Sequence, residues 1–145
     1  MATADLVPVI QATLAPMFLV SGGAIFLNFT QARLFRVVDR LRAFAKERGS
    51  GAPGTVALIE HKRNLRRAVI LRNAILLGTL VIAFTVLTAL LLLLAAAFGF
   101  DAGRAALTIF AVGLVCFMAA LALVVVDAFL SVAAALADPI DEEAR

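Results

Sequence analysis

The sequence has few of the residues that enzymes most often use for chemistry. Its 145 residues include one Cys, one His and no Trp or Tyr, and only 16% are charged. By contrast 63% are hydrophobic, whereas an average soluble domain is about 45–50% apolar and about 25% charged. A single core in a domain of 145 residues cannot bury so much apolar surface. A single Cys also excludes an intrachain disulfide. The composition therefore argues against a soluble enzyme and against a disordered chain.

Charged residues are also absent from three long stretches, at residues 6–32, 73–100 and 105–126. Each exceeds the roughly 20 residues that a helix needs to cross the hydrocarbon core of a bilayer. Because backbone groups in lipid must pair within their own segment, each stretch should be helical. The first has no basic residues before it and is too long for a signal peptide, so we expect it to be retained. The sequence predicts an all-α integral membrane protein with three transmembrane helices, at about residues 6–30, 73–98 and 105–131.

Residues 33–72, between the first two spans, hold all but two of the 13 Lys and Arg residues and only three acids. The positive-inside rule places this segment in the cytoplasm, with the N-terminus outside and the C-terminus inside. Apolar residues recur in it at helical spacing, interrupted by the turn-forming run 49–54. We therefore expect the first two helices to extend into an antiparallel helical hairpin at about 31–72, and an acidic cytoplasmic tail at 138–145.

The positive charge of the hairpin has more than one interpretation. It is first a topology signal, and it can also attract the anionic inner leaflet, at about 1 kcal/mol per Lys or Arg near the surface. Residues 138–145, or an acidic partner, could bind it as well. Nucleic acid is a poor partner, because no aromatic residues are interleaved with the charges. The basic juxtamembrane residues are Arg36, Arg40, Arg42, Arg66 and Arg67.

The third predicted helix carries a face of small and polar residues within an arc of about 60°. Such faces pack closely against other helices in membranes. The packing face consists of Gly113, Cys116, Ala120, Asp127 and Ser131, interrupted by Leu123.

Asp127 is the only acid within the predicted spans. We expect it near the inner interface, in a structural ion pair or beside the headgroups; a proton-carrying or cation-coordinating role is the alternative. The predicted polar layer at this level contains Asn28, Arg33, Arg72, Asn73 and Asp127.

The first predicted span contains Pro16 and the run Ser21, Gly22 and Gly23. Proline frees a backbone carbonyl, so a kink is expected there, and small residues favour close helix packing. Ser21 and Asn28 are seven residues apart and share a helix face, which gives a weak indication of a pore lining. Elsewhere no catalytic triad, metal-ligand spacing or nucleotide-binding loop is present. We predict no enzymatic activity, no cofactor and no metal, and His61 has no second ligand near it in the sequence.

Several of these residues together resemble a known bacterial family. They are the run Ser21–Gly23, then Asn28, the segment Arg36–Arg42, the pair Arg66 and Arg67, and the pair Arg72 and Asn73. The chain is similar over about residues 6–132 to domain-of-unknown-function family twenty-seven twenty-one, small three-helix membrane proteins with no assigned activity. The resemblance implies a multi-pass protein of the bacterial inner membrane.

Two functions are compatible with this pattern. The first is a non-enzymatic protein that acts through helix–helix association, as a homo-oligomer or as an accessory subunit of a larger membrane complex. The second is a homo-oligomeric ion channel, with polar residues of the first span or Asp127 lining the pore. A channel needs several copies, because three helices cannot enclose a pore.

Overall fold

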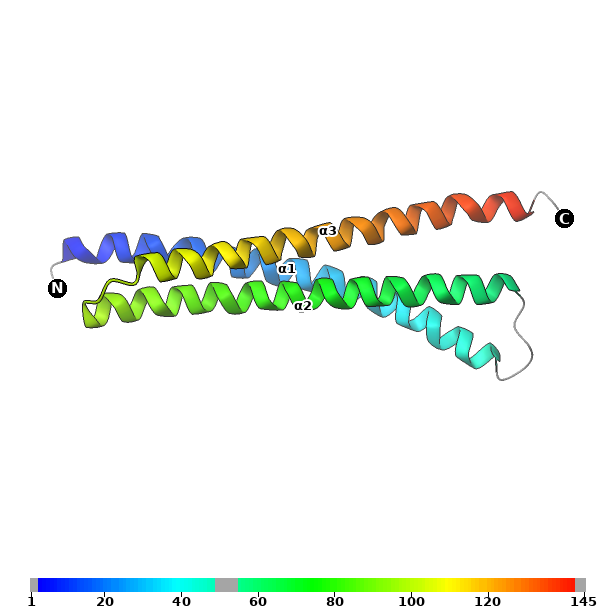
Figure 1. Cartoon of the computed structure of the whole chain (residues 1–145), viewed down its shortest axis with the longest axis horizontal. Helices are drawn as coiled ribbons and strands as arrows, with labels where there is room; N and C mark the ends of the chain where they lie inside the picture. Colours follow the sequence, from blue (N-terminus) through cyan, green and yellow to red (C-terminus); the bar gives the residue numbers. More distant parts are fainter. Residues whose placement is uncertain (1–2, 49–54, 143–145) are drawn as a thin grey trace. The chain divides into compact units, whose positions relative to one another are not determined.

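The computed structural model describes the backbone of residues 3–48 and 55–142 and the side chains of most residues from 14 to 46 and from 57 to 133. Within these ranges the chain forms three α-helices and no strand (Figure 1). Their bounds are α1, Thr3–Arg48; α2, Thr55–Phe98; and α3, Gly103–Glu142. The predicted all-α class is confirmed.

Each predicted membrane span lies within a longer helix. α1 continues through Pro16 and the run 21–23 without interruption. α3 continues to Glu142, so the first part of the expected acidic tail is helical. The predicted turn at 49–54 and residues 143–145 lie outside the described residues.

A short link joins α2 to α3. Gly99 has a positive φ of 71°, a conformation that glycine adopts without a steric penalty. Its N–H donates to the carbonyl oxygen of Ala95 at 2.9 Å, which ends α2. The carboxylate of Asp101 accepts a hydrogen bond from the N–H of Gly103 at 3.0 Å and so satisfies a free donor at the start of α3.

The chain divides into two compact units, each of which contains a segment of every helix. The first unit consists of Met1–Asn28 with Leu76–Ala119, and the second of Phe29–Ile75 with Ala120–Arg145.

Buried positions follow a seven-residue period along each helix. This spacing is typical of helices that pack with interlocking side chains, as in coiled coils. On α1 the buried positions include Pro16, Gly23, Thr30 and Val37, and on α3 they include Ala106, Gly113, Ala120 and Asp127. On α2 they alternate in steps of three and four, at Asn64, Arg67, Leu71, Ala74, Gly78, Val81, Thr85 and Thr88.

Small residues set the packing distance in the first unit. A Cβ atom added to Gly78 would lie 2.8 Å from Cδ2 of Leu27, and one added to Gly113 would lie 3.3 Å from Cβ of Phe84. Phe26 and Phe117 meet edge to face, with ring centroids 5.7 Å apart. Close approach through glycine is a common mode of helix packing in membranes.

Two helices in the described part of the chain are long and apolar enough to cross a membrane, at Ala57–Phe98 and Gly103–Ala133. Only 17% of the most apolar stretch of α2 and 11% of that of α3 is buried, whereas a core helix of a soluble protein would be mostly buried. The predicted first span, residues 6–30, is not one of these two helices, and several of its side chains lie outside the described residues.

Candidate functional site

The site is built around Asp127, a fully buried acid on α3 in the second unit. Asp127 lies seven residues after the buried Ala120, so the same seven-residue period that buries small residues also buries its carboxylate. A buried carboxylate costs free energy unless charged partners and hydrogen bonds compensate for its lost hydration.

Two arginines from the other two helices supply this compensation. Nε of Arg67, on α2, donates to Oδ1 of Asp127 at 2.8 Å. Nη1 of Arg33, on α1, donates to Oδ2 at the longer distance of 3.5 Å. Each carboxylate oxygen therefore has its own guanidinium, and the three helices are linked at one point.

The two arginines are held by further contacts. Nη2 of Arg67 donates to Oγ of Ser131 at 3.2 Å, one turn after Asp127 on α3. The guanidinium of Arg33 lies 5.2 Å from the ring centroid of Phe29, within the range of a cation–π contact. The Arg67 side chain is 11% exposed and that of Arg33 is 26% exposed. Arg67 is the inner partner of Asp127, and Arg33 is the partner nearer to the surface.

The polar layer predicted from the sequence forms only in part. Arg33 and Asp127 are brought together, but Arg72 and Asn73 are exposed and contribute nothing to the ion pairs. The reason is the phase of the helix. In this part of α2 the side chains of Leu71 and Ala74 are buried, so the two residues between them face outward.

Asn28 is also exposed, and it belongs to the first unit. The prediction placed Arg67 among the basic juxtamembrane residues and missed its role beside Asp127. Counting back along the helix from Ala74 by three and then four residues reaches Leu71 and Arg67, and this spacing would have placed Arg67 on the buried side of α2.

The predicted packing face of α3 matches the burial pattern closely. Gly113, Ala120 and Asp127 are buried, while Cys116 and Ser131 are half-buried. In α1 Pro16 and Gly23 are buried, and Gly22 faces open space. Ser21 and Asn28 are exposed, and Oγ of Ser21 donates to the carbonyl oxygen of Met17 at 3.2 Å.

A cavity of about 130 Å³ lies beside the ion pairs in the second unit. Among the described residues it is lined by Arg33, Arg36, Val37, Arg40, Arg67 and Ser131, of which four are arginines. Arg36 and Arg40 are exposed, so the cavity reaches the surface. Nε of Arg36 donates to the carbonyl oxygen of Ala32 at 3.3 Å. Within the described part of the chain neither arginine forms an ion pair.

The other two predicted basic residues do not line this cavity. Arg42 lies 3.6 Å from the carboxylate of Asp39 in an exposed pair on α1. Arg66 is exposed on α2, one residue before Arg67. Arg42 and Arg66 carry the same charge as the arginines of the cavity, but they do not lie at the cavity.

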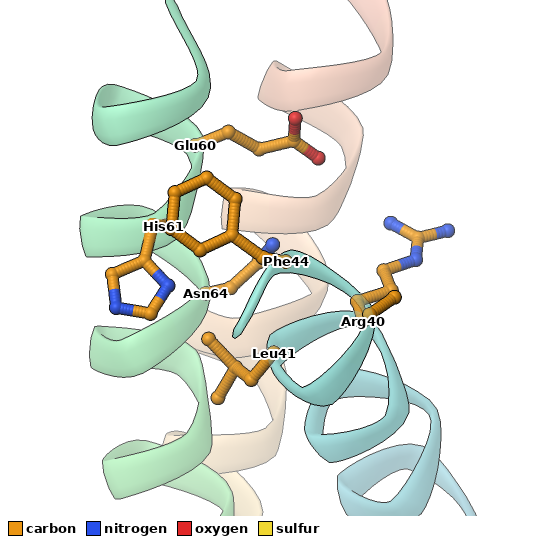
Figure 2. A pocket seen from close by; sticks show the side chains of 7 residues that line it. Arg40, Leu41, Phe44, Glu60, His61 and Asn64 are labelled. Carbon is orange, nitrogen blue, oxygen red and sulfur yellow. The ribbon is translucent and has the colours of Figure 1, made fainter. Parts of the chain in front are cut away.

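A second cavity, of about 250 Å³, lies between α1 and α2 in the same unit. Figure 2 shows Arg40, Leu41 and Phe44 of α1 on one side, and Glu60, His61 and Asn64 of α2 on the other. The rings of Phe44 and His61 stack, with centroids 4.5 Å apart and 23° between the planes. Nδ1 of His61 and Nε of Arg63 are buried and have no hydrogen-bond partner among the described residues.

No group of three or more His, Cys, Asp or Glu residues able to hold a metal ion occurs among the described residues. The inner side of α2 in this unit is polar, because it carries His61, Asn64 and Arg67.

These features define a class: an all-helical chain with two helices apolar enough to cross a membrane and a buried acid held by two arginines. Within this class, the chain belongs to the family described as "Protein of unknown function (DUF2721)", which matches residues 13–136. The family suggested by the sequence motifs is confirmed. No curated protein and no solved structure matches the chain.

Proposed function

We propose that this chain is a non-enzymatic, multi-pass protein of a bacterial inner membrane that acts by binding other membrane proteins through its helices. The bound protein is a second copy of this chain or a subunit of a larger complex. In this proposal residues 31–72 form a cytoplasmic hairpin, α1 supplies a third membrane span, the N-terminus lies outside and the C-terminus inside.

An exposed apolar stripe on α2 supports this proposal best. Leu58, Leu65 and Val69 lie on one side of the helix and are 41%, 46% and 49% exposed, with the exposed Lys62 between the two leucines. They precede the uncharged stretch that begins at residue 73 and stand among basic residues. In a segment outside the hydrocarbon, exposed leucines in a row favour a protein partner, because lipid chains do not cover them.

The composition of the buried positions supports helix association as well. The three helices bury mainly Gly, Ala, Thr and a few larger side chains, while most of the large apolar residues described are exposed. In a bilayer such surfaces are available to lipid and to other helices, and association depends on close packing and hydrogen bonds between them.

The copy number and the effect of the stripe test the proposal. We expect purified protein in mild detergent to have the mass of an oligomer by native mass spectrometry, or to remain bound to another membrane protein. Fully burying a leucine contributes about 1.5–3 kcal/mol. Because Leu65 is 46% exposed, covering the rest contributes about half of this, and Leu65→Gln should weaken association about three- to tenfold. Ile59→Gln is the matched control, because Ile59 is exposed on the same helix about 120° round from Leu65. A strictly monomeric protein without a bound partner would contradict the proposal.

The channel alternative rests on one observation. Ser21 and Asn28 are exposed polar residues, seven apart, in the largely apolar part of α1, so copies of the chain could turn them toward a shared pore. Ion flux through liposomes that contain the purified protein would favour this function. Flux that is unchanged in Asn28→Leu would argue against a pore lined by this face.

A further inference from the structure

We propose that the arginine-lined cavity beside Asp127 binds a phosphate group, either that of an anionic lipid headgroup or free inorganic phosphate. The lipid source rests on the membrane location proposed above, whereas the binding chemistry depends on the cavity alone.

The charges around the cavity are incompletely balanced. Four guanidiniums line it, those of Arg33, Arg36, Arg40 and Arg67. Asp127 is the acid that pairs with two of them, and its carboxylate is fully buried behind them. Arg36 and Arg40 form no ion pair with a described acid, so the described lining of the cavity carries more positive than negative charge. A bound anion would reduce the repulsion among these arginines.

The donors favour phosphate over a single carboxylate. Guanidinium groups match phosphate geometry and form short, charge-assisted hydrogen bonds with it, often in pairs. Four guanidiniums and the hydroxyl of Ser131 line the cavity. They can serve more acceptor oxygens than a carboxylate offers, and phosphate groups carry three or four. The volume of about 130 Å³ is roughly four times that of one water molecule in the liquid, which accommodates a phosphate group.

Asp127 acts here as a positioning residue. It holds Nε of Arg67 at 2.8 Å, and Arg67 in turn donates through Nη2 to Ser131. This arrangement fixes one buried guanidinium at the inner wall of the cavity. Arg36 and Arg40, at the exposed side, remain able to close on a ligand. The cavity thus combines a rigid inner donor with two adaptable outer donors.

Calorimetric titration of the purified full-length protein with inorganic phosphate at constant ionic strength tests the site. Arg36→Gln and Arg40→Gln remove outer donors but leave the ion pairs of Asp127 intact. Each lost hydrogen bond to a charged group should weaken phosphate binding about tenfold or more. Arg66→Gln is the control, because it removes the same charge from an exposed position that does not line the cavity. Thermal unfolding of all three variants establishes that each is folded.

Native mass spectrometry distinguishes the two sources of phosphate. Protein from nanodiscs of phosphatidylcholine with phosphatidic acid should retain phosphatidic acid selectively if the ligand is a lipid, and Arg40→Gln should lose it. Saturable binding of free phosphate without lipid retention would assign a soluble ligand.

An equal loss of binding in Arg66→Gln would show diffuse charge attraction and overturn the site, as would the absence of both phosphate and lipid binding. Because the titration does not depend on the number of copies, a monomeric protein that binds phosphate would contradict only the proposed association.

Discussion

At the scale of single residues, Asp127 and its two arginines form the buried ion pairs described in the second unit. The acid is fully buried, and a buried ion pair is stabilising only relative to states in which one partner is missing. Two guanidiniums share one carboxylate, so removing the acid leaves two positive charges close together. Removing either arginine leaves the carboxylate with one partner.

Asp127→Asn should therefore destabilise the protein by about 3–5 kcal/mol, the range for breaking a buried pair. Unfolding in mixed detergent micelles, followed by circular dichroism, measures the change. Arg42→Gln is the control, since the pair of Arg42 with Asp39 is exposed and contributes about 0–1 kcal/mol. Equal stabilities of Asp127→Asn and Arg42→Gln would refute a structural role for the buried acid.

At the scale of the helices, the seven-residue period explains why small residues recur at buried positions. Gly23, Gly78 and Gly113 each lie where an added Cβ would meet a side chain at 3.3 Å or less. Gly22, by contrast, has no atom within 4 Å of such a Cβ. Gly22 and Gly23 are adjacent in the sequence but differ in their contacts. Only the glycines at buried positions set the packing distance in the first unit.

Gly78→Leu should lower the free energy of unfolding by about 1–3 kcal/mol through overpacking against Leu27 and Phe26. Gly22→Leu is the matched variant, because it makes the same chemical change where space is open. Both substitutions alter helix propensity equally, so the difference between them isolates packing. Detergent unfolding curves that coincide for the two variants would show that the close approach at Gly78 is unimportant for stability.

At the scale of the whole molecule, the arrangement of charge along the chain predicts how it inserts. Nearly all the basic residues lie at 33–72, between the first two predicted spans, and the positive-inside rule orients a chain by such asymmetry. The second link and the first residues of α3, residues 99–104, hold only Asp101 and Arg104 as charged residues. The proposed topology places these two parts on opposite sides of the membrane.

Cysteine labelling in intact cells tests this topology. In a Cys116→Ser background, which removes the only native cysteine, Phe100→Cys should react with a membrane-impermeant maleimide added from outside. Lys62→Cys should react only after the inner membrane is permeabilised. Both positions are exposed in the structure, so a difference in labelling reports sidedness. Labelling of Lys62→Cys from outside would invert the proposed orientation.

The helices could be predicted from the sequence, because long uncharged stretches and apolar periodicity are local properties of the chain. The predicted third span, at about 105–131, lies within α3, which continues to Glu142. The packing face of α3 also follows from the sequence, because small residues at helical spacing mark one side of a helix.

What the sequence by itself determined is the helical class, the family and the concentration of positive charge at residues 33–72, since composition and periodicity along one chain are sufficient for these. Only the tertiary structure decided which arginines meet Asp127. Arg67 and Arg72 are both basic residues on α2, yet the phase of the helix buries the first and exposes the second. An ion pair depends on the position of one helix relative to another, and that position follows from packing across all three.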